Sequence, residues 1–155
     1  MLYPTLNEVE ELLKDYQMVP VFYEVLADYM TPIRMFQALR KQGTPCFMLE
    51  SVENKDQWGR YSFIGINPRS EIKISGKELE ANGVKQKEEF QMRYLSDLIE
   101  KYKSPVMEDY PKLTGGLIGY FGYDMIRQVE KKLTNVPEDD LNMPECHLCM
   151  YDEIN

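Results

Sequence analysis

The sequence EIKISGKELEANGVKQK, residues 71–87, is the clearest sign of how this chain folds. Glu71 to Ser75 alternate between polar and apolar side chains, which is the period-two pattern of a half-buried strand. Within Glu78 to Lys87, the pair Asn82-Gly83 is the strongest short signal for the tight turn of a β-hairpin. We therefore expect antiparallel strands in this part of the chain.

Further strands are predicted on both sides of this hairpin. Val19 to Leu26 is rich in β-branched and aromatic side chains, Cys46 to Leu49 is a short apolar run, and Cys146 to Tyr151 alternates again. Tyr61 to Ile66 is stopped by Asn67-Pro68, and Leu113 to Phe121 is predicted to be a glycine-rich strand.

Helices are predicted by their starts and their apolar stripes. Thr5-Leu6-Asn7-Glu8 has the form of a capping box and predicts a helix over residues 5–16. Thr31-Pro32 supplies an N-cap and a proline at the first helical position, and Gly43 ends that helix. A third helix carries the stripe Phe90, Leu95, Leu98, Ile99 and Tyr102, and a short one spans residues 124–131.

The strands outnumber the helices and do not follow a strand–helix–strand rhythm. The predicted class is therefore α+β, with mostly antiparallel, sandwich-like sheets and three to four flanking helices. A length of 155 residues suits one domain. Met150-Tyr151-Asp152 lies inside what looks like a continuing strand, and a domain rarely stops there because the edge would be left unpaired. We therefore expect the chain to be a fragment of a longer protein.

Composition excludes several classes of function. The 18 basic and 26 acidic residues give a net charge of −8, and such a protein repels the phosphates of nucleic acid. No apolar run approaches the roughly 20 residues that span a bilayer, and the acidic, amphipathic N-terminus is not a signal peptide. Three cysteines are too few for a disulfide scaffold, so a reducing cytoplasm is expected.

Two motifs are similar to cofactor-binding patterns, but a structural role explains each of them better. Cys146 and Cys149 form a C-x-x-C motif, but in a strand they point to opposite faces and cannot hold one metal ion. The stretch Gly115 to Asp124 matches no phosphate-binding pattern, and its glycines instead indicate close approach of another backbone segment. With one histidine, His147, a serine triad has little support.

A possible ligand site follows the predicted strand that ends at Leu49. Glu50 and Ser51 place a carboxylate beside a hydroxyl, which together can bind an ammonium group. Consecutive strand residues face opposite ways, so both groups converge only where the strand ends or bulges. An ordinary strand-to-loop edge is the alternative interpretation.

The order of the motifs resembles anthranilate synthase component I, from about Pro20 to Asp152. Leu49-Glu50-Ser51 is similar to the end of the Leu-Leu-Glu-Ser element with which that family binds tryptophan; Met48 replaces the first leucine, an apolar change that should matter little. The other matching pieces are Pro20-Val21-Phe22-Tyr23-Glu24, Asp28, Thr31-Pro32-Ile33, residues 59–65, Asn67-Pro68, residues 115–124, Arg127, Glu130 and residues 143–152.

This resemblance implies that residues 1–155 are the N-terminal regulatory domain of that enzyme, without its C-terminal catalytic domain. The complete enzyme converts chorismate and glutamine-derived ammonia to anthranilate and pyruvate, with a separate glutamine amidotransferase subunit and a magnesium ion. The family's chorismate and magnesium residues lie in the C-terminal domain, so no catalytic residue, metal ligand or cofactor is expected here. This part would carry half of the L-tryptophan feedback site: Leu49, Glu50 and Ser51, with Lys55 and Arg60 as further candidates.

Two other functions are compatible with the same residues. The equivalent domain of aminodeoxychorismate synthase, in the folate pathway, shares the architecture and some motifs, although the Glu-Ser pair favours the anthranilate enzyme. A free-standing, non-catalytic ligand-binding module belongs to a different class. The product of the complete protein distinguishes the first alternative, and the coding sequence beyond Asn155 distinguishes the second.

Overall fold

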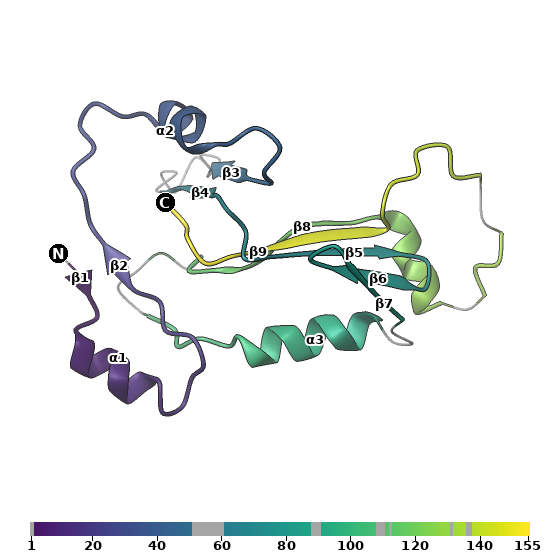
Figure 1. The fold of residues 1–155 in the computed structure, drawn as a ribbon, viewed down its shortest axis with the longest axis horizontal. Coiled ribbons are helices and arrows are strands. Elements are labelled where there is room, and N and C mark those ends of the chain that lie inside the picture. The colour runs from purple at the N-terminus through teal and green to yellow at the C-terminus, as the bar shows by residue number, and fades with distance from the viewer. Residues whose placement is uncertain are drawn as a thin grey trace, which may run out of the picture.

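A computed structural model describes residues 2–50, 61–87, 91–107, 111, 113–130, 132–135 and 138–155. Figure 1 shows two regions: a five-stranded sheet with one long helix beside it, and a smaller assembly of short strands and helices at the other end. The observed class is α+β with antiparallel sheets, as predicted. No helix in the described part has the length and apolar character needed to cross a bilayer.

The large sheet has the order β7-β6-β5-β9-β8, and every neighbouring pair is antiparallel. The predicted hairpin region forms one side of it, from the edge strand β7 to the central strand β5, and Asn82 and Gly83 both have positive φ as the tight turn requires. The Asn82 side chain also accepts a hydrogen bond from the backbone N–H of Glu71. The strands are β5 (Ser70–Ser75), β6 (Glu78–Ala81), β7 (Val84–Lys87), β8 (Gly116–Phe121) and β9 (Cys146–Tyr151).

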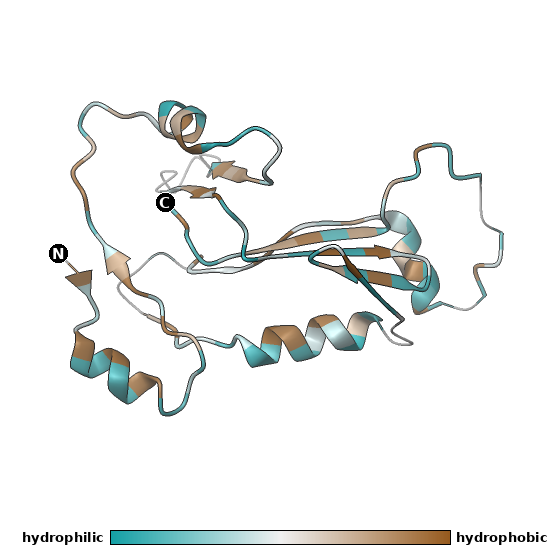
Figure 2. Cartoon of the chain, in the orientation of Figure 1, coloured by the Kyte–Doolittle hydropathy of each residue, from teal (hydrophilic) through white to brown (hydrophobic). Residues whose placement is uncertain are grey.

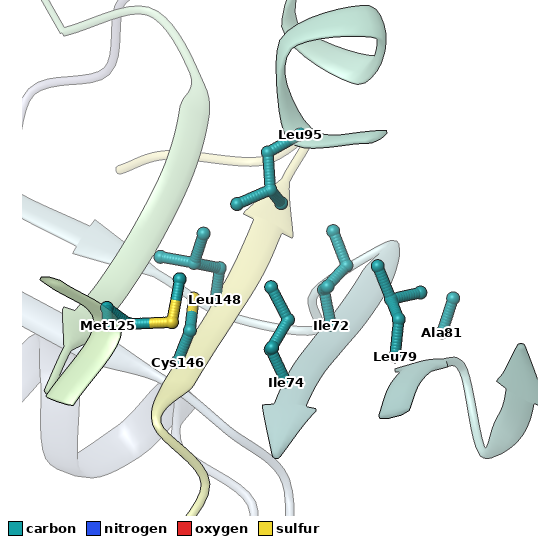
Figure 3. Close-up of a cluster of buried hydrophobic side chains, with 8 residues drawn as sticks. All are labelled: Ile72, Ile74, Leu79, Ala81, Leu95, Met125, Cys146 and Leu148. Atoms are coloured by element: carbon teal, nitrogen blue, oxygen red, sulfur yellow. The ribbon is translucent and has the colours of Figure 1, made fainter. Parts of the chain in front are cut away.

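The hydrophobic core lies on one face of this sheet, between the strands and helix α3 (Gln91–Lys101). Alternate residues of β5, β6 and β9 point toward Leu95 of α3 and Met125 of the 3₁₀ helix η1 (Tyr123–Gln128), as Figure 3 shows. The eight buried members of this cluster are Ile72, Ile74, Leu79, Ala81, Leu95, Met125, Cys146 and Leu148. We call this the α3 face of the sheet, and the opposite one the second face.

The N-terminal region is built from short elements. Strands β1 (Leu2–Tyr3) and β2 (Phe22–Tyr23) form one two-stranded sheet, and β3 (Phe47–Glu50) and β4 (Ser62–Gly65) form another. Helices α1 (Leu6–Leu12) and α2 (Pro32–Leu39) have the predicted caps at Thr5 and Thr31, yet neither contains a buried residue. Their apolar stripes, visible in Figure 2, are therefore only partly covered in this chain.

Several predicted elements are shorter than expected. The strand predicted over residues 19–26 is only Phe22–Tyr23, since its partner β1 has two residues and Pro20 has no N–H to donate. The helix predicted to end at Gly43 ends at Leu39, and Gly43 instead adopts a positive φ in the following turn. The short helix expected near residue 124 is the 3₁₀ helix η1.

The C-terminal residues connect the two regions. Beyond β9, Ile154 forms an isolated bridge with Gly65, and the backbone of Asn155 exchanges two hydrogen bonds with Ile64. Phe47 of β3 also packs edge-on against Tyr151 of β9, with ring centroids 4.9 Å apart. These contacts place the β3–β4 pair at the end of the large sheet, near the C-terminus (Figure 1).

Candidate functional site

The β3–β4 pair positions two of the predicted ligand residues. Leu49 lies opposite Phe63 and Glu50 lies opposite Ser62, at the end of the ladder where the strands lead into residues 51–60. Alternation along β3 sends the side chains of Leu49 and Glu50 to opposite faces of the pair. Ser51, Lys55 and Arg60, the other predicted contacts, lie outside the described residues.

Leu49 and Glu50 are both accessible. The Leu49 side chain is 47% exposed, which is high for a leucine in a strand, and Glu50 is exposed as well. Within the part of the chain that the structure describes, the Glu50 carboxylate has no hydrogen-bond or ion-pair partner. A free carboxylate and an uncovered apolar side chain at one strand end can receive an ammonium group and an apolar ring.

A cavity of about 510 Å³ lies against the same hairpin. Ser62 and Phe63, the residues opposite Glu50 and Leu49, form part of its wall, whereas Leu49 and Glu50 themselves do not line it. The remaining lining comes from the chain before β2, from the loop before β8 and from the residues after β9. The predicted site residues are therefore next to the cavity and not inside it.

The cavity combines aromatic walls with one ion pair. Phe22, Tyr61, Phe63 and Tyr151 line it, and the Arg69 guanidinium lies 3.2 Å from the Asp152 carboxylate on its rim. Both charged side chains are about half exposed, so the pair contributes little to stability and remains available to a ligand. Sequence reasoning missed Arg69 and Asp152 as a pair, because residues 83 positions apart meet only through the pairing of β5 with β9.

The glycine-rich strand β8 has the structural role predicted for it. A side chain at Gly119 would overlap the carbonyl oxygen of His147 on the neighbouring strand. Gly122 lies similarly close to the backbone of Glu145, and its N–H donates to the Glu145 carbonyl. These glycines allow β8 to approach β9 closely, which confirms the structural interpretation of this motif.

The C-x-x-C motif is divided between the two faces of the sheet. Cys146 is buried in the core on the α3 face, and burial raises the pKa of its thiol to about 11. Cys149 lies on the second face with His147, and its sulfur is 4.0 Å from His147 Nε2. The two cysteines therefore cannot bind one ion together, as the alternation of the strand predicts.

Magnesium does not fit the donor groups that the structure brings together. Among the described residues, the set with metal-ligand spacing is Glu71, His147 and Cys149. Magnesium takes hard oxygen ligands in octahedral geometry, and this set offers one carboxylate with a thiol and an imidazole. No step that uses magnesium can be derived from these residues.

Comparison with known proteins identifies the family, although no family model matches the chain. The chain is 42% identical over 158 residues to anthranilate synthase component 1 of Acetivibrio thermocellus, covering 99% of this chain and 32% of that protein. It is 35% identical over 151 residues to the same component of Acinetobacter calcoaceticus, covering 91% and 30%. It therefore spans about a third of the length of these relatives.

The fold agrees with this similarity. The crystal structure of anthranilate synthase component I from Streptococcus pneumoniae TIGR4 matches with a TM-score of 0.53 and 30% identity, over 86% of this chain and 28% of that one. Sequence similarity along nearly the whole chain and structural similarity thus point to the same proteins. The chain therefore matches about a third of the length of anthranilate synthase component I proteins, in sequence and in fold.

Proposed function

We propose that this chain is the N-terminal, tryptophan-sensing part of an anthranilate synthase component I. The complete protein would convert chorismate and ammonia to anthranilate and pyruvate, with its chemistry, including the magnesium site, in polypeptide beyond these residues. The observation that carries the proposal is the exposed Glu50 carboxylate, which has no partner among the described residues and lies beside half-exposed Leu49. The sequence match that supports it covers 99% of the chain.

The proposed site is half of an amino-acid pocket, and it requires the chain to turn at Glu50, where β3 ends, so that Glu50 and Leu49 face one ligand. Glu50 would bind the ammonium group of L-tryptophan together with Ser51, and Leu49 would contact part of the indole ring. A pocket that buries most of an aromatic ligand needs apolar walls on both sides of the ring. Because Leu49 lies at the surface, the second wall would come from the catalytic domain of the same protein, and tryptophan would favour one arrangement of the two domains.

The apolar surface of the N-terminal region supports a domain contact of this kind. Large hydrophobic side chains on and between α1, β2, α2 and β3 are exposed: Leu6, Leu13, Val21, Tyr23, Val25, Leu26, Tyr29, Ile33 and Leu49. Single exposed apolar residues are normal on a protein surface, whereas a run through a whole region marks an interaction surface. We assign this surface to the protein's own catalytic domain. The glutamine amidotransferase subunit, component II, is proposed as a further partner of the complete protein.

Inhibition of the complete protein by tryptophan tests this assignment. Glu50→Gln keeps the size of the side chain but removes the charge that would bind the ammonium group. The tryptophan concentration for half inhibition should rise by about 10-fold or more, as expected for loss of a charge-assisted hydrogen bond. Ser51→Ala should act in the same direction with a smaller effect.

The matched control is Glu10→Gln, which removes an exposed carboxylate from α1. This control should leave inhibition unchanged, and the rate without tryptophan shows whether each variant is folded. Equal inhibition of the Glu50→Gln and Glu10→Gln enzymes would remove Glu50 from the site. The 155-residue chain alone should form no anthranilate from chorismate and ammonia, and turnover by it would contradict the assignment of the chemistry to another domain.

A further inference from the structure

Three metal-binding side chains meet on the second face of the large sheet, away from the hairpin site. Glu71 comes from β5, and His147 and Cys149 come from β9, where they are two residues apart and share one face. The ligand atoms of the three residues lie within 4.8 Å of one another. His147 Nε2 is 2.8 Å from Glu71 Oε1 and 4.0 Å from Cys149 Sγ.

The register of the two strands builds this cluster. Glu71 pairs directly with Cys149, and its diagonal neighbour on the same face is His147. Cys149 is buried, while Glu71 and His147 are about one-third exposed, so the cluster is sheltered on one side and open to solvent on the other. A rigid antiparallel ladder with one open side is a suitable frame for an ion that enters from solution.

We propose that Glu71, His147 and Cys149 bind a zinc ion that links β5 to β9. Thiolate, imidazole and carboxylate are the three ligand types that zinc uses in proteins, and three such ligands with one water complete its tetrahedron. With usual zinc bond lengths, the corners of that tetrahedron are about 3.4–3.6 Å apart. The distances to the Cys149 sulfur therefore need to shorten, by about 1 Å at most, while the 2.8 Å His147–Glu71 contact opens by about 0.6 Å. The ion would replace the hydrogen bond between His147 and Glu71.

Two charged side chains next to the cluster, those of Lys73 and Glu80, affect how a cation would bind. The Lys73 ammonium is 3.1 Å from the Glu71 carboxylate and competes with a cation for it. Lys73 has a second acidic residue within reach, because Glu80 of β6 lies directly opposite it on the same face. On zinc binding, Lys73 would turn toward Glu80, and the Cys149 thiol would release its proton to solvent.

Binding of zinc would require the Cys149 thiol to ionise. Burial, followed by the negative charge of Glu71, raises the pKa of this thiol. A bound divalent cation acts in the opposite direction and stabilises the thiolate.

Titration calorimetry with zinc chloride tests the site in the chelator-treated, reduced 155-residue protein. One ion should bind per chain. His147→Gln, Cys149→Ser and Glu71→Gln should each weaken binding by about 100-fold or more, since each removes a direct ligand and even indirect partners of a metal site are worth 10–100-fold. The matched controls are Cys46→Ser, a thiol outside the cluster, and Glu78→Gln, which like Glu71 has a lysine partner on the sheet. Both controls should bind zinc as the parent protein does.

Two further measurements separate a zinc site from a structural cluster. Lys73→Met removes the competing ammonium and should tighten zinc binding several-fold, an effect that a purely structural Lys73 would not produce. Cobalt should give a thiolate-to-metal absorption band that is lost in Cys149→Ser and kept in Cys46→Ser. Absence of one-to-one binding in the folded parent protein, or binding that survives both His147→Gln and Cys149→Ser, would overturn the proposal. Circular dichroism confirms that each variant used is folded.

Discussion

The five-stranded sheet and the N-terminal region differ in how their side chains are used. Ile72, Ile74 and Leu79 in the sheet have 0% exposure, whereas α1 and α2 contain no buried residue at all. Weak helix signals do not explain this lack of buried residues, because both N-terminal helices have well-formed caps, and Thr5 with Glu8 makes a complete capping box. A helix can thus be correctly encoded by its own residues and still lack the partner that would bury its apolar face.

This difference assigns separate tasks to the two regions. Burial of apolar surface is the main source of folding free energy, so the stability of the chain comes from the sheet and α3. The N-terminal region keeps apolar and charged groups accessible, and it carries the proposed tryptophan residues Leu49 and Glu50. The proposed zinc site belongs to the sheet, where a fixed backbone register holds its three ligands.

Truncation of one leucine in each region should show the largest contrast. Leu79→Ala removes a side chain with 0% exposure from the centre of the core and should lower the free energy of unfolding by about 2–5 kcal/mol. Leu6→Ala removes a side chain of α1 that is 72% exposed and should change it by about 0.5 kcal/mol or less. Urea unfolding of the 155-residue chain measures both values. Similar losses for the two variants would mean that α1 is packed and that the division into two regions is wrong.

Two glycines on paired strands, Gly119 and Gly65, extend the comparison to the backbone. Alanine at Gly119 would overlap the backbone carbonyl of His147 in the sheet, while alanine at Gly65 would overlap the ring of Phe47 in the hairpin. A ring can rotate away, whereas a carbonyl within a ladder moves only if the strands separate. We expect Gly119→Ala to cost about 1–3 kcal/mol, and Gly65→Ala to cost less. The ranking is checked by thermal unfolding, and the reverse order would show that the hairpin is the more rigid of the two.

Acidic pH should change the stability of the two regions by different amounts. This effect should be smaller than those of the leucine and glycine substitutions. Partial burial alone would raise the pKa of Glu71, but its hydrogen bonds with Lys73 and His147 outweigh this, so the pKa lies below the ordinary value of 4.5. A carboxyl group whose pKa is lowered by folding stabilises the folded state above its unfolded pKa, and this contribution is lost as the pH falls. The free energy of unfolding of Glu71→Gln should therefore lie furthest below that of the parent protein at about pH 6, and the difference should become smaller by about pH 3.

Glu8 provides the matched case in the N-terminal region. Hydrogen bonds to the side chain and backbone of Thr5 also lower the pKa of Glu8. The sign of the effect on stability is the same, but Glu8 is fully exposed on a helix without a fully buried residue, so Glu8→Gln should change global stability less. Chemical unfolding at several pH values, in the presence of a chelator, gives both profiles. A larger effect for Glu8 would show that α1 unfolds together with the sheet.

Local patterns predicted much of the fold. The caps at Thr5 and Thr31, the Asn82-Gly83 turn and the alternation of β5 and β9 each depend on residues only a few positions apart, and all appear in the structure. The strand predicted over residues 19–26 was too long, because its length depends on a two-residue partner that the local pattern does not reveal. Leu49 and Glu50 were placed at a strand end as predicted, while Ser51, Lys55 and Arg60 lie outside the described residues.

The sequence by itself determined which segments form strands and helices and which family the motifs resemble, since both depend on residue types at short spacing. Only the tertiary structure decided which side chains meet across the sheet. Glu71 meets His147 and Cys149, and Arg69 meets Asp152, because β5 pairs with β9 in one register. That register is selected by burying Ile72, Ile74, Cys146 and Leu148 on the same face, because a slip of one residue in either strand would turn that strand's apolar side chains to the opposite face.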